Sequence, residues 1–299
     1  KDGEVRVRVL AAGVSLPDLM MREGIHPETP RLPFTPGWDL IGVVDRLGSG
    51  VSGIERGQTV AALPITGAYA EVLLRPVARL VKLPAGIDDR TAAAMMLKGL
   101  TAQYLLRRTY RVKKGDTILM HAAAGGVGLI LCQWAKALGA TVIGTVGSDE
   151  KAALAKKAGC KHVIVTSREK FVERVKQITQ GKGVPVVYDG VGKDTFMDSL
   201  DCLAPLGLMA SFGNASGAVT QFNPGVLAQK GSLFLTRPTL NTYAAAREDL
   251  VKGAAELFSV VKSGKVKISI NQTYPLREAA QAQRDLESRK TTGSTVLIP

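Results

Sequence analysis

The sequence predicts an α/β protein in which a doubly wound parallel sheet is inserted into a β-rich domain. Short β-type runs separated by glycine and proline fill the first third of the chain. From about Leu97 onward, β-branched runs alternate with helical stretches, which is typical of parallel βαβ units. The elements after Pro238 are too few to form a third domain. We therefore predict one domain from residues 1–99 plus 240–299, and an inserted domain over residues 100–239.

Composition and charge indicate a globular protein with an affinity for anions. The 299 residues suggest two domains at roughly 150 residues each, and a hydrophobic fraction of 45% excludes intrinsic disorder. A net charge of +13 attracts nucleotides, nucleic acids and membrane surfaces alike. We expect no membrane span, because the long uncharged run 117–135 is interrupted by His121 and three glycines. Three separated cysteines without CxxC spacing favour a reducing compartment, so we expect a cytoplasmic protein: Cys132, Cys160 and Cys202.

The first domain is expected to contain several short strands. Residues 4–9 alternate apolar and polar side chains with period two, as a half-buried strand does. Four more apolar runs, bounded by glycine or proline, predict further strands at 39–47, 59–63, 68–74 and 79–83.

The inserted domain alternates strands with helices. About six strands are expected, which is the number that a dinucleotide-binding sheet uses; they are 117–121, 141–145, 162–166, 184–189, 208–212 and 232–236. Helical patterns lie between the early strands, at 127–138, 149–158, 168–179 and 195–203. After the inserted domain we expect a helix, a strand, a helix and a closing strand, at 246–262, 266–274, 276–288 and 294–298.

The most informative motif is HAAAGGVG at residues 121–128, between a predicted strand and a predicted helix. Against the pattern GxGxxG it has Ala123, Gly125 and Gly128, so alanine replaces the first glycine. The middle glycine lets the backbone approach a pyrophosphate, and the helix N-terminus attracts the anion. The strand–turn–helix context that this motif requires is present, which predicts a dinucleotide site.

The end of the second inserted strand bears on the choice of dinucleotide. NAD-binding sites usually have an acid there to bind the ribose 2′-hydroxyl, whereas this strand is followed by Gly147 and Ser148. A hydroxyl at Ser148 with Lys151 one helical turn later suits a 2′-phosphate, which favours NADPH. Asp149 and Glu150 leave a ribose acid in a shifted register as the alternative, and Ser148 is also a good helix N-cap.

These segments resemble the zinc-independent quinone oxidoreductases, the zeta-crystallin-like proteins of the medium-chain dehydrogenase/reductase superfamily. The resemblance runs over nearly the whole chain and is strongest between Leu97 and Asn214. It implies a GroES-like catalytic domain with an inserted Rossmann domain, NADPH in the interdomain cleft, and a homodimer formed through the Rossmann sheets. The segments that carry it are KGLTA at 98–102, the turn at 121–128, QWAKALGA at 133–140, GTVG at 144–147, SFGN at 211–214 and LESR at 286–289.

The resemblance also implies which residues form the site. Phe212 and Asn214 would lie beside the nicotinamide, and Arg289 near the cofactor. The remaining implied cofactor-binding residues are Thr101, Gly125, Gly126, Val127, Gly128, Ser148 and Lys151. Ser15 and Asn214 are the candidate polar contacts to the substrate, although Asn214 also suits a turn.

The sequence argues against a zinc centre. Zinc dehydrogenases of this superfamily have a Cys after the first strand and a His–Glu pair after a later glycine; here Ser15 and Trp38–Asp39 occupy those places. Catalytic zinc needs three protein ligands, and Asp39 alone does not provide them. Family members often have an asparagine at the Ser15 position and tyrosines lining the quinone side, where Met21 and His26 stand here. Quinone preference is therefore less secure than the reaction class.

Three functional hypotheses follow. The first is NADPH-dependent, zinc-independent reduction of a quinone by hydride transfer. The second is NADPH-dependent reduction of a 2-alkenal or enone, because an activated alkene also accepts hydride without a metal. The third, of a different class, is RNA binding by a crystallin-like relative through the basic stretch around Arg107, Arg108 and Lys114, although no nucleic-acid-binding motif accompanies it.

Overall fold

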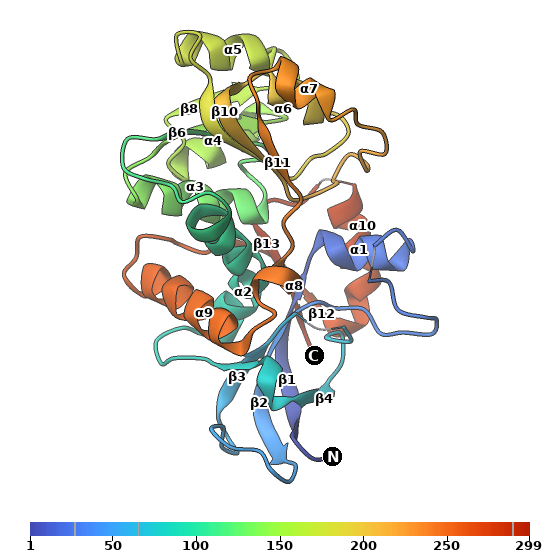
Figure 1. The fold of residues 1–299 in the computed structure, drawn as a ribbon. Coiled ribbons are helices and arrows are strands. Elements are labelled where there is room, and N and C mark those ends of the chain that lie inside the picture. The colour runs from blue at the N-terminus through green and yellow to red at the C-terminus, as the bar shows by residue number, and fades with distance from the viewer. Residues whose placement is uncertain (27, 65, 289) are drawn as a thin grey trace. The chain divides into compact units, whose positions relative to one another are not determined.

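The chain forms two compact units, and the predicted fold class is confirmed (Figure 1). The computed structural model describes residues 1–26, 28–64, 66–288 and 290–299. Unit 1 combines the first hundred residues with two later segments: Lys1–Leu100, Tyr243–Gly264 and Ile268–Pro299. Unit 2 is formed by Thr101–Thr242 with Lys265–Lys267.

Unit 1 is built on a seven-stranded sheet. Its strands follow the order β12-β13-β1-β2-β3-β5, and β4 also pairs with β1. The strands are β1 (Glu4–Val14), β2 (Leu40–Leu47), β3 (Thr59–Ala62), β4 (Val72–Pro76), β5 (Leu80–Lys82), β12 (Ile270–Pro275) and β13 (Ser294–Ile298). β12 and β13 pair with each other, and β13 pairs with β1, so the C-terminal segment belongs to the sheet of unit 1.

β1 is longer than the alternating pattern of residues 4–9 predicts. Its first half has alternating burial, whereas Ala11 to Val14 are all buried. Register shifts at Arg6/Val7 and Val9/Ala11 bend the strand, so its two halves pair with different partners, β4 and β13. A segment buried on both faces has no period-two pattern, so the sequence did not predict the second half of β1.

One helix, which begins in unit 1 and ends in unit 2, was not predicted from the sequence patterns. α2 (Asp89–Tyr104) is buried nearly all round between Ala92 and Leu97, so it lacks the polar face that marks a surface helix. The π-helical turn η2 (Leu105–Thr109) follows it in unit 2. The other helices of unit 1 are α1 (Leu16–Arg22), η1 (Val77–Arg79), α9 (Arg247–Lys262), η3 (Leu276–Glu278) and α10 (Ala279–Glu287), and α8 (Leu240–Tyr243) also crosses the boundary between the units.

Unit 2 contains a six-stranded, all-parallel sheet in the order β11-β10-β9-β6-β7-β8. The direction of winding changes between β6 and β9, and such switch points bind ligands at the carboxyl ends of the strands. The strands are β6 (Thr117–Met120), β7 (Thr141–Val146), β8 (His162–Val165), β9 (Val184–Asp189), β10 (Leu203–Ser211) and β11 (Phe234–Thr236). The helices are α3 (Gly126–Ala137), α4 (Asp149–Lys157), α5 (Phe171–Ile178), α6 (Phe196–Leu200) and α7 (Gly225–Gln229).

α5 begins three residues later than expected. The amides of Arg168 and Glu169 both donate to the carbonyl of Val165, which forms a turn in place of a first helical turn. Arg168 is therefore held at the end of β8 and not on the helix.

A buried polar chain fixes the carboxyl ends of three strands in unit 2. The His121 ring is 2.9 Å from Thr145 Oγ1 and 2.9 Å from Ser199 Oγ, and Ser199 donates to Asp189 at 3.2 Å. Burial lowers the pKa of His121, and the nearby Asp189 carboxylate opposes that effect. The chain orders the edge of the sheet where the predicted site residues gather. Among the described residues, no helix is both long and apolar enough to cross a membrane.

Candidate functional site

The turn between β6 and α3 has the geometry of a phosphate-binding loop. Ala122 lies in the left-handed region with φ of +53°, and its carbonyl accepts a hydrogen bond from the Gly125 amide at 2.9 Å. The Ala123 amide donates to the Thr145 carbonyl at 3.0 Å, which fastens the turn to β7. Gly125 is the N-cap residue of α3 in an extended conformation.

The two glycines of this turn have different structural roles. A Cβ on Gly128 would lie 2.5–2.7 Å from backbone atoms of Ala122 and Ala123, so this glycine is required by the packing of α3 against the turn. A Cβ on Gly125 would meet only the Ala122 carbonyl oxygen, at 3.2 Å. An added Cβ at Gly125 would thus make one tight contact, whereas one at Gly128 would meet several backbone atoms at once. Close approach of a ligand is a second reason for glycine at Gly125.

The first turn of α3 supplies the groups that attract an anion. Gly126, Val127 and Gly128 are its first three residues, and the N–H groups of a helix's first turn have no partner within the helix. The partial positive charge of the helix N-terminus adds to this attraction. Leu129, Ile130 and Leu131 are buried and anchor the helix to unit 2, so these donors are held in place.

The turn after β7 and the first turn of α4, residues 147–151, contain the residues that were expected to contact an adenosine phosphate. We call this segment the corner after β7. Ser148 is the N-cap of α4, and its Oγ accepts a hydrogen bond from the Lys151 amide at 3.4 Å. A hydrogen bond from Ser148 lowers the pKa of Glu150. The N-cap role of Ser148 is thus present, and Lys151 lies on the same helical turn.

Arg168 belongs to this corner, and the sequence analysis did not identify it. Its Nη1 lies 2.6 Å from Asp149 Oδ1, so the ion pair joins the turn after β8 to the start of α4. Asp149 was the alternative ribose acid, and here its carboxylate is engaged by this arginine. The signal that would have found Arg168 is a basic residue directly after the third strand of the sheet, but the predicted helix placed it in a first helical turn.

Phe212 and Asn214 are held at the same carboxyl edge of the sheet. The Phe212 amide donates to the Asp189 carbonyl at 2.8 Å, and its ring packs on Gly190, where an added Cβ would come within 2.9 Å. The Asp189 carboxylate accepts from the amides of Val191 and Gly192 at 2.7 and 3.1 Å, which fixes the turn below this segment. Asp189 ends β9 as predicted, and its role in holding this turn has no local signal in the sequence.

The remaining predicted site residues lie in several different parts of the chain. Ser15 is buried in unit 1, and its amide donates to Asp18 Oδ2 at 2.8 Å. Thr101 lies in α2 at the start of unit 2. Arg289 lies outside the described residues. The rings of His26 and Trp38 contact each other edge to face, with centroids 5.1 Å apart.

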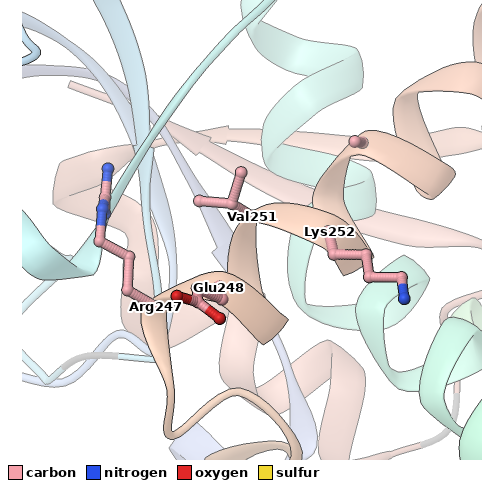
Figure 2. A pocket seen from close by; sticks show the side chains of 5 residues that line it. Arg247, Glu248, Val251 and Lys252 are labelled. Atoms are coloured by element: carbon pink, nitrogen blue, oxygen red, sulfur yellow. The ribbon is translucent and has the colours of Figure 1, made fainter.

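A shallow surface pocket in unit 1 contains none of the predicted site residues (Figure 2). It lies along α9 and is lined by Arg247, Glu248, Val251, Lys252 and Ala255. Arg247 Nη1 donates to the carbonyls of Ala78 and Leu80 at 2.9 Å, so its guanidinium is bound to the fold. This pocket has no groups arranged for chemistry.

Comparisons with known proteins agree with this geometry. Residues 1–85 match the family model of the alcohol dehydrogenase GroES-like domain, and residues 126–258 match that of the zinc-binding dehydrogenase. A quinone oxidoreductase of Pseudomonas aeruginosa is 54% identical over 99% of this chain and 91% of its own length. The chain belongs to the quinone oxidoreductase family of the medium-chain dehydrogenase/reductase superfamily.

Two further relatives carry different names, quinone oxidoreductase and 2-haloacrylate reductase. The crystal structure of Escherichia coli quinone oxidoreductase complexed with NADPH matches with a TM-score of 0.97 and 50% identity, covering 100% of this chain and 92% of that one. A 2-haloacrylate reductase of a Burkholderia species is 47% identical over 99% of this chain and 91% of its own length. The predicted family resemblance is confirmed.

One of the two matching family models is described as a zinc-binding dehydrogenase, so we looked for zinc ligands in this chain. Within the described parts of the chain, no three His, Cys, Asp or Glu side chains lie together in a way that could hold a metal ion. The family resemblance leads us to expect Ser15 and Trp38 at the positions where zinc dehydrogenases have cysteine and histidine. Zinc independence remains a prediction that metal analysis of the purified protein can test.

Two glycine substitutions should separate packing from ligand approach. We expect Gly125→Ala to destabilise the fold less than Gly128→Ala does, because its methyl meets a single backbone oxygen at 3.2 Å, and to weaken NADPH binding, because the methyl obstructs a pyrophosphate. Gly128→Ala should destabilise the fold by about 1–3 kcal/mol, because its methyl meets backbone. Urea unfolding and NADPH fluorescence titration measure the two effects. Equal loss of stability in both variants would contradict the distinction.

Proposed function

We propose that the protein is an NADPH-dependent, zinc-independent oxidoreductase that reduces quinones. The observation that carries this proposal is the glycine turn between β6 and α3, where Gly125 presents a backbone without a side chain at the N-terminus of α3. When bound, NADPH supplies the hydride. The chain's part is to bind the pyrophosphate at Gly125–Gly128 and to orient the nicotinamide beside Phe212 and Asn214.

The corner after β7 supports NADPH over NADH. Lys151 and Arg168 place two cationic side chains near Ser148, and arginine binds phosphate with a planar pair of donors. Asp149 keeps Arg168 oriented in the free protein, and a 2′-phosphate would compete with it for the guanidinium. The E. coli relative whose structure contains NADPH supports the same cofactor.

The proposed substrate class is one that accepts a hydride without help from a metal ion. A quinone accepts hydride without metal assistance, whereas an unactivated ketone benefits from it. The relatives named quinone oxidoreductase favour a quinone. A 2-alkenal or related activated alkene is the second candidate, and the 47% identical 2-haloacrylate reductase is the observation that favours it. Ser15 and Asn214 are proposed polar contacts to the substrate in either case.

The edge of the unit 2 sheet supports a homodimer. β11 is the last strand of the sheet, and Phe234 and Leu235 on it are exposed, with Phe234 at 60%. Leu206, within the neighbouring strand β10, is 66% exposed. An exposed apolar edge strand pairs readily with a second copy of itself, which would extend the sheet across a twofold axis.

The remaining proposals concern location and RNA. Three free, buried thiols suit a reducing environment, so we propose that the protein works in the cytoplasm.

RNA binding lacks support of its own: Arg107 lies in the π-helical turn after α2, and both Arg107 and Arg108 already take part in interactions within the chain. Salt-dependent retention on single-stranded RNA that NADPH relieves would revive that hypothesis.

Substrate class is tested by single-turnover oxidation of bound NADPH. We expect rapid oxidation with 1,2-naphthoquinone or 9,10-phenanthrenequinone and slower oxidation with a 2-alkenal, followed by the loss of nicotinamide absorbance. Oxidation by the alkenal but by no quinone would assign the protein to the alkene reductases. NADPH fluorescence that the protein leaves unchanged would refute the cofactor assignment itself.

Cofactor choice is tested by removing each cation of the corner. Lys151→Ala and Arg168→Ala should each weaken NADPH binding by about 10- to 150-fold, which corresponds to a charge-assisted hydrogen bond of about 1.5–3 kcal/mol, and leave NADH nearly unchanged. Arg174→Ala is the matched control, because Arg174 pairs with Glu169 on the same unit. Equal losses for NADPH and NADH would show that neither side chain contacts a 2′-phosphate.

The proposed dimer is tested at β11. Phe234→Lys should convert a dimer into a monomer in sedimentation velocity, because a charge replaces the apolar centre of the edge. Met197→Lys is the control, since Met197 is also exposed on unit 2 but lies on α6. A wild-type protein that sediments as a monomer would contradict the proposal.

A further inference from the structure

Two buried thiols of unit 2 lie in contact with each other. Cys132 is on α3 and is 0% exposed, and Cys160 lies between α4 and β8 and is 6% exposed. Their sulfur atoms are 3.4 Å apart, and both thiols are free. Because a disulfide has an S–S distance of about 2.05 Å, an approach of about 1.4 Å would bring these two sulfur atoms to bonding distance.

Cys160 is fastened to the end of α4. Its amide donates to the Ala155 carbonyl at 3.1 Å, and the Gly159 amide donates to the Lys156 carbonyl at 2.9 Å. Gly159 lies in the left-handed region with φ of +101°. Two such hydrogen bonds around a left-handed glycine form a Schellman motif. A displacement of the Cys160 backbone is therefore passed to α4.

Cys132 lies on the face of α3 that packs against the glycine turn. It follows Gly128 by four residues, so the two positions share one face of the helix. The Cys160 sulfur lies against β7, because a Cβ on Gly144 would come within 2.7 Å of this sulfur and also within 2.7 Å of the Ala123 Cβ. The sulfur pair is thus enclosed by α3, β7 and the end of α4, beside the glycine turn.

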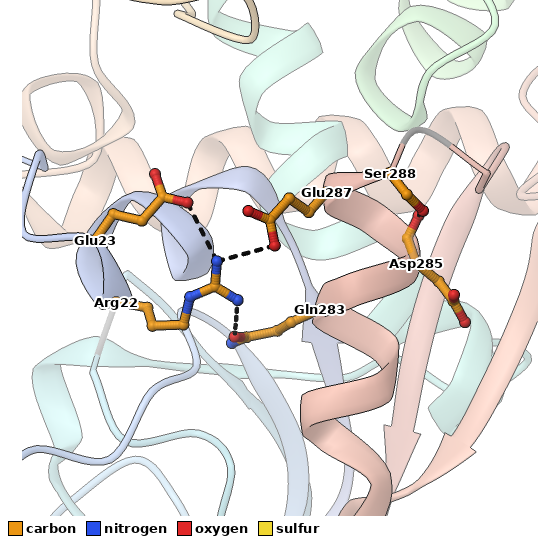
Figure 3. A network of polar contacts seen from close by, with 6 residues as sticks. All are labelled: Arg22, Glu23, Gln283, Asp285, Glu287 and Ser288. Atoms are coloured by element: carbon orange, nitrogen blue, oxygen red, sulfur yellow. Dashed lines mark hydrogen bonds and ion pairs between the residues drawn. The ribbon is translucent and has the colours of Figure 1, made fainter.

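A polar network joins two helices of unit 1 in a different way. Arg22 at the end of α1 pairs with Glu23 and with Glu287 of α10 at 3.2 and 3.1 Å, and it donates to Gln283 at 3.3 Å (Figure 3). Ion pairs as exposed as these contribute little to stability. The thiol pair of unit 2 is buried, and its two members can be joined by a covalent bond. It can therefore hold α3 and the end of α4 in one fixed arrangement.

α3 and α4 carry the two phosphate-binding segments of the proposed function. The first turn of α3 is the proposed site for the pyrophosphate, and the corner after β7, at the start of α4, is the proposed site for the 2′-phosphate. The two helices also pack against each other. One ligand would span both segments, so a shift of about 1 Å between the helices would misplace one end of it. The contact between Cys132 and Cys160 contributes to that spacing.

We propose that Cys132 and Cys160 form a reversible disulfide, and that this bond weakens dinucleotide binding by unit 2. The effect on the dinucleotide rests on the proposed function, whereas the formation of the bond does not. The oxidant is hydrogen peroxide, because only a small molecule can reach sulfur atoms that are buried in this way.

The reaction proceeds in two steps. The Cys160 sulfur attacks one oxygen of the peroxide, the O–O bond breaks, and the other oxygen leaves as water with the thiol proton, which gives a sulfenic acid on Cys160. The Cys132 sulfur then attacks the sulfenic sulfur, and the hydroxyl leaves with the Cys132 proton as a second water. Two thiols and one peroxide thus become one disulfide and two waters. A dithiol reductant reverses the bond, which suits a reducing compartment.

Cys160 is the position at which oxidation begins. It is the more exposed of the two thiols, and it lies in a turn and not within a helix. The hydrogen bond with Cys160 and burial together raise the pKa of the Cys132 thiol well above its ordinary value. Because the thiolate is the nucleophile, Cys132 is the less reactive toward peroxide. Its place is in the second step, where the sulfur that it attacks is already in contact with it.

Formation of the bond is tested by counting thiols in the whole protein after peroxide treatment and denaturation. Wild type should lose two of its three thiols and yield a tryptic peptide pair that joins Cys132 to Cys160, and dithiothreitol should reverse both changes. Cys202→Ala is the matched control, because Cys202 is a buried thiol whose sulfur contacts the Asp198 carbonyl, and this variant should still form the bond.

The order of the two steps is tested in the other cysteine variants. Cys132→Ala should accumulate a sulfenic acid on Cys160 that dimedone labels, whereas in Cys160→Ala the Cys132 thiol should remain reduced. Retention of all three thiols by wild type, or loss of thiols without the joined peptide pair, would overturn the proposal.

The effect on dinucleotide binding is tested by NADPH fluorescence titration of the two redox forms. The oxidised protein should bind NADPH about 5-fold or more weakly than the reduced protein, and dithiothreitol should restore the affinity. By linkage, saturating NADPH should make the disulfide easier to reduce by the same factor. In Cys132→Ala, peroxide should leave the NADPH affinity unchanged.

Equal NADPH affinity of the two redox forms would overturn the proposed effect of the bond. A protein that forms the disulfide but binds NADPH in neither form would refute the proposed function, and with it the effect on the dinucleotide, and would leave the disulfide itself established.

Discussion

The close approach of α3 to the turn after β6 is the constraint on which unit 2 depends. Gly128 lies so near the carbonyls of Ala122 and Ala123 that no side chain fits between them. This contact brings the helix N-terminus to the carboxyl edge of the sheet, where β6 and β9 diverge. The left-handed conformation of Ala122 costs about 1–2 kcal/mol, and the hydrogen bonds from Gly125 and to Thr145 help to hold it. The anion-attracting end of α3 is thus positioned before any ligand arrives.

A second layer of buried polar contacts keeps this edge rigid. Asp189 accepts hydrogen bonds from the turn that follows β9, and through Ser199 it is linked to His121 at the end of β6. Its carbonyl also fixes Phe212. A buried carboxylate is tolerated here because its oxygens are satisfied by amide and hydroxyl donors. Asp189 thus holds both the glycine turn and the Phe212 segment in place, although these two segments are far apart in the sequence.

Unit 1 handles its buried carboxyl groups in a different way. Asp189 is fully hydrogen-bonded, whereas Asp18 and Asp39 each retain an oxygen without a partner, beside a single lysine. Complete hydrogen bonding explains why the buried Asp189 carboxylate is tolerated, whereas the two carboxyl groups of unit 1 depend on the neighbouring Lys98 ammonium.

The amino-acid sequence by itself determined the fold class, the parallel alternation of unit 2 and the glycine turn, because these follow from local periodicity and from residues a few positions apart. β9 and β13 have the predicted bounds, and the family resemblance was confirmed. Only the tertiary structure decided which glycine serves packing, that Arg168 joins the corner at Ser148, and that Asp18, Asp39 and Lys98 share one buried cluster. Helix α2 and the second half of β1 also escaped prediction, because segments buried on all sides carry no alternating pattern. Contacts between residues 20 to 80 positions apart depend on how the chain folds back, and no local pattern records them.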